Sequence, residues 1–204
     1  PVRVVRAAGS LLERTGRSNE ALKLYGDFLA GSPGNVAIES TLKRLESGKP
    51  SPRLVSDAKG GIAESLFNIA SALPRDRSGD MAMVYARLAL HLNPDFELAR
   101  LLLGDLFDSQ RRYTDANRIY QQVDRASPYS WPARLRTADN LTDMDRTDRA
   151  VDMLRALAEE RPERTDALIK LGGILRSKER YPEAVEAYDA AGKRLGKIMP
   201  GHWL

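Results

Sequence analysis

The chain has 204 residues, of which 42% are hydrophobic and 6% aromatic, and its formal net charge is +4. A chain of this length can bury a substantial core, and a low aromatic content suits many short helices better than a β-sandwich. The small charge excess lies in residues 1–62, where 10 Lys and Arg stand against 6 Asp and Glu. It forms no concentrated basic patch, which argues against nucleic-acid binding.

The first 35 residues predict two helices joined by a short polar turn. Apolar and small residues recur at helical spacing on both sides of the turn, and a proline ends the second stretch. These residues are Val5, Ala8, Gly9, Leu12, Ala21, Tyr25, Phe28 and Pro33.

Residues 36–62 break this order. "VAIESTLKRLESG" predicts one helix with Val36, Ile38, Leu42 and Leu45 on its apolar side and Gly48 as its stop. "KPSP" is a turn, and the next helix is expected to be long or kinked, since two adjacent glycines, Gly60-Gly61, weaken it. Two interpretations stay open for 36–62: a degenerate repeat without its second helix, or a functional hinge.

From residue 63 the chain repeats every 34 residues. In 97–130, the two predicted helices 97–110 and 114–126 carry Leu103-Gly104, Phe107, Ala116 and Tyr120, and Pro128 follows them. The same phase returns in the flanking segments, as Ile69-Ala70, Leu73, Ala82, Ala86 and Pro94; Thr137-Ala138, Leu141, Ala150, Leu154 and Pro162; and Leu171-Gly172, Leu175, Ala184 and Tyr188. Paired helices at this period indicate a solenoid.

Close helix packing explains the pattern. Small residues on the first helix of each pair let the second helix approach, and a larger residue on the second helix fills the space between neighbours. The small residues on the first helices are Gly104, Ala138 and Gly172, and the small residues expected to face them from the second helices are Ala116, Ala150 and Ala184. The larger residues are Tyr120, Leu154 and Tyr188.

These landmarks resemble the tetratricopeptide repeat (TPR) family, and the resemblance covers about five-sixths of the chain. It implies an all-α, right-handed α-solenoid of antiparallel helix pairs, with about eleven or twelve helices and no β-sheet. We expect one solenoid over 1–204 with repeats at 2–35, 63–96, 97–130, 131–164 and 165–198. Arg100, Arg134 and Phe28 depart from the family pattern.

The resemblance also implies a partner site. In TPR proteins, positions 2, 5, 9 and 12 of each first helix line a concave groove that binds peptides; we name these positions the first-helix stripe. Its apolar row and neighbouring charges give the candidate groove residues Phe67, Leu98, Leu101, Asp105, Asp108, Leu135, Asp139, Ile169 and Arg176. The Lys and Asn of the family's carboxylate clamp are absent, so a clamp for acidic tails is not expected. Alternatively, the apolar row packs against a neighbouring helix or against the chain's own terminus.

Catalysis is not expected. The chain has no cysteine, which excludes disulfides, thiolate chemistry and cysteine-based zinc sites. Its histidines, His91 and His202, are isolated, and no metal-ligand spacing or Gly-rich phosphate loop occurs. No catalytic residue, cofactor or metal is therefore predicted, and no apolar run approaches the roughly 20 residues of a membrane span.

The expected function is a non-catalytic protein-protein interaction scaffold that holds a peptide or helix of a partner in its groove. The alternative is a self-association module of a larger bacterial assembly protein. The resemblance suggests a bacterial cell-envelope or periplasmic location over a cytoplasmic one. Because "MPGHWL" at 199–204 restarts an apolar segment, we also expect a fragment whose parent protein continues with further repeats.

Overall fold

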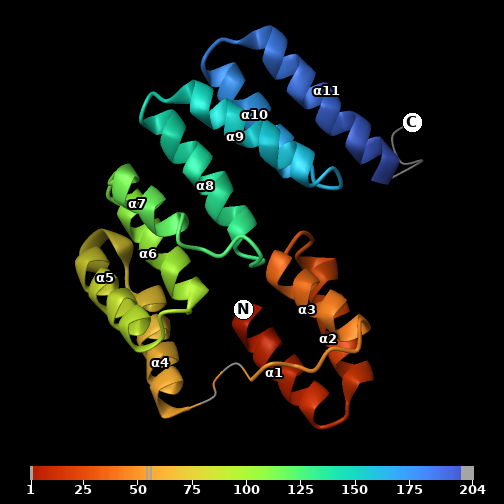
Figure 1. Ribbon diagram of the computed structural model, residues 1–204, viewed down its shortest axis with the longest axis vertical. Helices are drawn as coiled ribbons and strands as arrows, with labels where there is room; N and C mark the ends of the chain where they lie inside the picture. Colours follow the sequence, from red (N-terminus) through yellow and green to blue (C-terminus); the bar gives the residue numbers. More distant parts are fainter. Residues whose placement is uncertain (1, 54, 56, 199–204) are drawn as a thin grey trace. The chain divides into compact units, whose positions relative to one another are not determined.

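The computed structural model describes residues 2–53, 55 and 57–198, without the side chains of 75–78, 197 and 198, and all regular secondary structure in these residues is α-helical (Figure 1). Segment 199–204, with His202 and Trp203, lies outside the described residues. The helices are α1 (Val2–Arg14), α2 (Ser18–Gly31), α3 (Val36–Glu46), α4 (Ala58–Ala72), α5 (Arg75–Leu92), α6 (Glu97–Ser109), α7 (Tyr113–Tyr120), α8 (Ser130–Asp143), α9 (Thr147–Glu160), α10 (Asp166–Ser177) and α11 (Tyr181–Ile198). The eleven helices of the described residues, with no strand among them, confirm the expected all-α fold class.

The chain forms two compact units. The first contains residues up to 103 together with 123–130, and the second contains 104–122 together with the residues from 131 onward. In the first unit, α1 packs on α2, α3 packs on both, and α4 packs on α5. In the second unit, α10 packs on α9 and on α11. The expectation of one continuous solenoid with the stated repeat bounds stays a prediction.

Sequence signals explain where the helices begin and end. The Asn35 side chain accepts a hydrogen bond from Ile38 N at the start of α3, and Asp57 Oδ1 accepts one from Gly60 N at 2.7 Å at the start of α4. Helix α3 ends before Gly48, whose φ is +71°. The glycine pair after Asp57 lies in the first turns of α4, where a loss of helix propensity does little harm.

The turns inside four of the helix pairs share a backbone conformation that recurs with the repeat. Gly16, Arg111, Asp145 and Glu179 all have positive φ, and each occupies the fifteenth position of its 34-residue repeat. Only the first of the four is a glycine, the residue that adopts this conformation without strain.

Glycine and tyrosine set the distance between paired helices. A Cβ built on Gly172 would lie 2.7 Å from Cε1 of Tyr188, and Gly9 and Gly104 face Tyr25 and Tyr120 in the same way. The pair Ala138 and Leu154 occupies these positions in 131–164, and both residues are fully buried. The packing inferred from the sequence is thus present in the structure.

No described helix is both long enough and apolar enough to cross a membrane.

Candidate functional site

In the first unit, several side chains of the first-helix stripe bind other residues of the same unit. Arg3 Nε of α1 donates to Glu64 of α4 at 2.7 Å, and its guanidinium lies over the rings of Phe67 and Phe96. Those two rings are 5.0 Å apart between centroids. Arg6 Nη1, the next stripe position on α1, donates to Tyr129 Oη at 2.7 Å. These cations and aromatic rings therefore stabilise the unit and are not free for a partner.

The apolar stripe residues of α6 in this unit also pack inward. Leu101 is 7% exposed, and Leu98 packs against the buried cluster of Ala63, Ala89, Phe96 and Ala99. Phe67 packs against the same cluster. For these three predicted groove residues, packing against a neighbouring helix is a sufficient reason for their apolar character.

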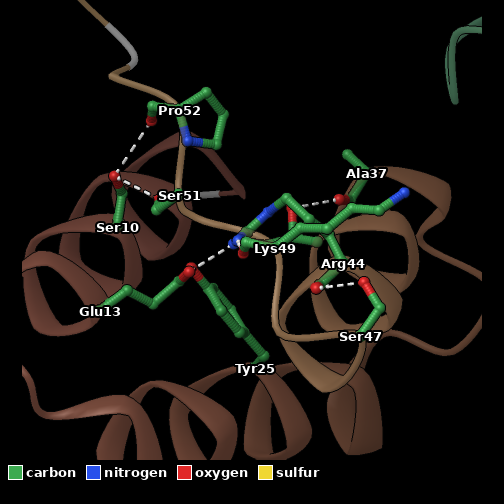
Figure 2. Close-up of polar contacts among 10 residues, drawn as sticks. Ser10, Glu13, Tyr25, Ala37, Arg44, Ser47, Lys49, Ser51 and Pro52 are labelled. Carbon is green, nitrogen blue, oxygen red and sulfur yellow. Dashed lines mark hydrogen bonds and ion pairs between the residues drawn. The ribbon is translucent and has the colours of Figure 1, made fainter.

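A polar cleft of about 580 Å³ lies beside α1 and α3 in the first unit. Arg44 of α3 and Tyr25 of α2 line it, and Figure 2 shows both bound to Glu13 of α1: Arg44 forms an ion pair with its carboxylate at 2.6 Å, and Tyr25 Oη donates to the same carboxylate at 2.9 Å. Only 5% of the Glu13 side chain and 19% of the Arg44 side chain are exposed. Burial, followed by the bond to Glu13, raises the pKa of Tyr25.

The segment after α3 is held on α1 by the same lining (Figure 2). Ser51 Oγ donates to Ser10 Oγ at 2.9 Å, Ser10 Oγ donates to Pro52 O at 3.4 Å, and Arg44 Nη1 donates to Lys49 O at 2.6 Å. These polar groups bond each other, so the cleft fixes the path of 49–52 and leaves few of its donors for a ligand. Both interpretations of 36–62 stay predictions.

The stripe of the second unit is acidic. Asp105 on α6 lies 3.1 Å from Nε of Arg136 on α8, and Asp139 on α8 lies 2.6 Å from Nζ of Lys170 on α10. Each pair joins residues 31 apart (136 − 105 and 170 − 139), so the first helices of successive repeats are linked by the same ion pair. Tyr120 Oη also donates to Asp105 Oδ1 at 2.7 Å.

Asp108 belongs to this cluster but has no ion pair within the described residues. Burial raises the pKa of its carboxyl, and the nearby carboxylates Asp105, Asp143 and Asp139 raise it further, while Arg136 opposes them. The stripe of the second unit thus holds one half-buried carboxylate without a counter-ion.

The remaining predicted residues of this unit differ in exposure. Leu135 is half-buried and packs against the core around Leu154 and Leu171, whereas Ile169 is 47% exposed and Arg176 is exposed. The structure therefore brings Asp105, Asp108 and Asp139 together and leaves Ile169 accessible on the next first helix. No three His, Asp or Glu side chains in the described ranges are placed to hold a metal ion.

Sequence reasoning missed Arg136, Asp143 and Lys170. Each of the three lies one residue after a position of the first-helix stripe, so the family pattern did not include it. The sequence does hold a signal for Arg136 and Lys170, since each is a basic residue 31 positions after an acidic residue of the stripe. Glu13 and Arg44 have the same separation in the first unit.

The Asp108 environment predicts a pH-dependent effect on stability. A carboxyl whose pKa is raised on folding holds its proton more tightly in the folded state, so its ionisation at neutral pH lowers the free energy of unfolding. We expect Asp108→Asn to raise the melting temperature at pH 7 by about 1–3 °C. The gain should vanish below the ordinary carboxyl pKa of about 3.9, where both states hold the proton.

Thermal melts at pH 7 and pH 3 measure this effect, with the exposed Asp152→Asn on α9 as the control. A lower melting temperature for Asp108→Asn at pH 7, or an equal gain at both pH values, would show that Asp108 is not destabilised by its neighbours.

Comparisons with known proteins bear on this arrangement. Residues 135–194 match the tetratricopeptide repeat family. Among solved structures, the chain is similar to "MamA 41-end from Desulfovibrio magneticus RS-1", with a TM-score of 0.56 and 16% identity, over 98% of this chain and 97% of that one. It is also similar to "MamA MSR-1 C2", with a TM-score of 0.53 and 17% identity, over 96% and 97% of the two chains. No curated protein sequence matches the chain.

Proposed function

We propose that this chain, which carries tetratricopeptide repeats, is a non-catalytic scaffold that binds a segment of a partner protein along the first-helix stripe of its second unit. The supporting observation is the contrast between the two units. Arg3, Arg6 and Phe67 are occupied by internal contacts in the first unit, whereas Asp108 lacks a counter-ion and Ile169 is exposed in the second.

The charge of the stripe suggests the chemistry of the partner. A lysine or arginine beside Asp108 would relieve the repulsion that it experiences from the neighbouring carboxylates. An apolar side chain of the same segment would cover Ile169, which is 47% exposed. The proposed ligand is therefore a basic segment that also carries an apolar residue.

Charge reversal at Asp108 tests this function. We expect Asp108→Lys to lower the amount of partner that co-purifies with the full-length protein from its own cells by about tenfold or more. The melting temperature should not fall, because the change removes repulsion within the chain. Quantitative mass spectrometry of the co-purified proteins measures the loss.

The matched control is Asp152→Lys, an equal charge change at an exposed position on the second helix α9. Equal capture by wild type and Asp108→Lys, or an equal loss in both variants, would remove the stripe of the second unit as the binding site.

Self-association is the second candidate, and one observation favours it. Among the described side chains of α11, four large apolar or aromatic ones are exposed and could pack on another helix: Tyr181, Val185, Tyr188 and Leu195. A second copy would bury this apolar surface. Light scattering across a dilution series tests self-association, because a monomer at every concentration would exclude it.

For the compartment we propose the bacterial cell envelope, on the family resemblance alone. Fractionation of cells that express the full-length protein tests it, and recovery only with the cytoplasmic fraction would contradict it.

A further inference from the structure

The second helices of successive repeats are joined by ion pairs at one boundary of the second unit. Nη1 of Arg180, the residue before α11, lies 2.9 Å from Oδ1 of Asp148 on α9, and Nη2 of Arg155 on α9 lies 2.9 Å from Oε2 of Glu183 on α11. Each of these arginines thus has a carboxylate from the neighbouring repeat as its partner.

The equivalent boundary between α7 and α9 has two arginines and no carboxylate opposite either of them. Subtracting one period of 34 residues from Arg180 and Asp148 gives Arg146 and Thr114, and from Glu183 and Arg155 it gives Arg149 and Gln121. Neither a hydroxyl nor an amide can neutralise a guanidinium. Arg146 and Arg149 are exposed and form no ion pair with the rest of the described chain.

The nearest acidic residues along the chain are already engaged elsewhere. Asp145 lies 3.2 Å from Nζ of Lys178, and Asp148 is the partner of Arg180. Asp143 and Asp152, each three residues from one of the arginines, form no ion pair with them within the described residues.

A cleft of about 410 Å³ lies at this boundary. Arg118 joins Arg146 and Arg149 in its lining, and no carboxylate takes part. Leu141 and Met153 supply an apolar surface within the same cleft. Asn117 also lines it, and its Oδ1 accepts from Asn140 Nδ2 at 3.0 Å, which fixes the orientation of the amide.

We propose that the cleft between α7, α8 and α9 binds an acidic segment of a partner protein. Carboxylate side chains of that segment face Arg146 and Arg149, next to Thr114 and Gln121, which stand opposite the two arginines where the next boundary has Asp148 and Arg155. Carboxylates match the planar donor pattern of a guanidinium, and the apolar part of the cleft receives a neighbouring aliphatic side chain. This surface is built from second helices and takes an acid, so it is distinct from the acidic first-helix stripe.

Fluorescence anisotropy with a labelled synthetic peptide of alternating Glu and Leu residues tests the proposal. The peptide should bind the wild-type chain, and binding should weaken as salt screens the charges. We expect Arg146→Gln combined with Arg149→Gln to lower the affinity by about tenfold or more. The control variant Arg155→Gln changes an arginine on α9 outside the cleft lining and should bind the peptide as wild type does.

A second variant supplies the missing carboxylate from within the chain. Thr114→Asp places an acid opposite Arg146, as Asp148 is placed opposite Arg180. It should lower the affinity for the peptide by a similar factor while the melting temperature stays equal or rises, which separates loss of the site from loss of the fold.

Three results would overturn the proposal. One is equal affinity of wild type and the double arginine variant for the acidic peptide, including the absence of binding to both at millimolar peptide. Another is equal binding of a peptide in which Lys replaces Glu. The third is arginine-dependent binding of inorganic phosphate without any binding of the peptide, which would make the occupant a phosphate group.

Discussion

Replacing Gly104 by valine should lower the free energy of unfolding by an amount near the upper end of about 1–3 kcal/mol, the usual cost of overpacking. A Cβ built on Gly104 would lie 2.7 Å from Cδ1 and 2.9 Å from Cζ of Tyr120, closer than carbon atoms approach without repulsion. Tyr120 is 3% exposed and its hydroxyl is bonded to Asp105, so the ring cannot easily move away.

A denaturant titration measures the effect, and Gly192→Val is the matched control. Gly192 is also helical, but a Cβ there would meet nothing within 4 Å, so this change should be close to neutral. The double variant Gly104→Ala with Tyr120→Leu copies the Ala138–Leu154 pair of the next repeat and should recover stability relative to Gly104→Val. Equal losses at Gly104 and Gly192 would show that close approach is not the reason for the glycine.

The second large effect is expected at the Glu13–Arg44 pair. Arg44→Met should cost about 3 kcal/mol or more, because it leaves a carboxylate with a 5% exposed side chain without its counter-ion. Glu13→Gln in the same chain should restore most of the loss, since an amide keeps the bond to Tyr25 without a charge. Chemical denaturation of the two variants measures both changes.

The exposed Arg17–Glu20 pair provides the comparison. Both side chains are 57% exposed and screened by solvent, so Arg17→Met should destabilise the chain far less than Arg44→Met. If Arg44→Met is as mild as Arg17→Met, then Glu13 is sufficiently hydrated without Arg44, and the pair does not hold α3 on α1.

The sequence predicted the helices and their pairing because both depend on local spacing. Small residues such as Gly104 and large ones such as Tyr120 recur every 34 residues, and helix stops such as Gly48 fall where the apolar pattern ends. The turn positions Arg111, Asp145 and Glu179 escaped prediction, since their positive φ is imposed by the packing of the helix pair and not by their residue type.

The candidate site was harder to predict, because an aliphatic residue at one repeat position can either be buried by a neighbouring helix or stay exposed for a partner. Leu101 and Ile169 occupy the same repeat position and are both aliphatic, yet the first is 7% exposed and the second 47% exposed. An apolar residue on a first helix signals burial without saying whether a neighbouring helix or a partner covers it. Likewise, the acidity of Asp105 and Asp108 is visible in the sequence, but only the structure shows that Arg136 pairs with the first of them.

The most direct test of the scaffold function is site-specific cross-linking from Ile169 in the full-length protein within its own cells. With p-benzoylphenylalanine at this position, we predict a cross-link to one partner protein, at a segment that contains lysine or arginine. The same photoreactive residue at Asp152 on α9 should not cross-link to that segment. Cross-linking of the same segment from Asp152 and not from Ile169 would contradict binding along the first-helix stripe.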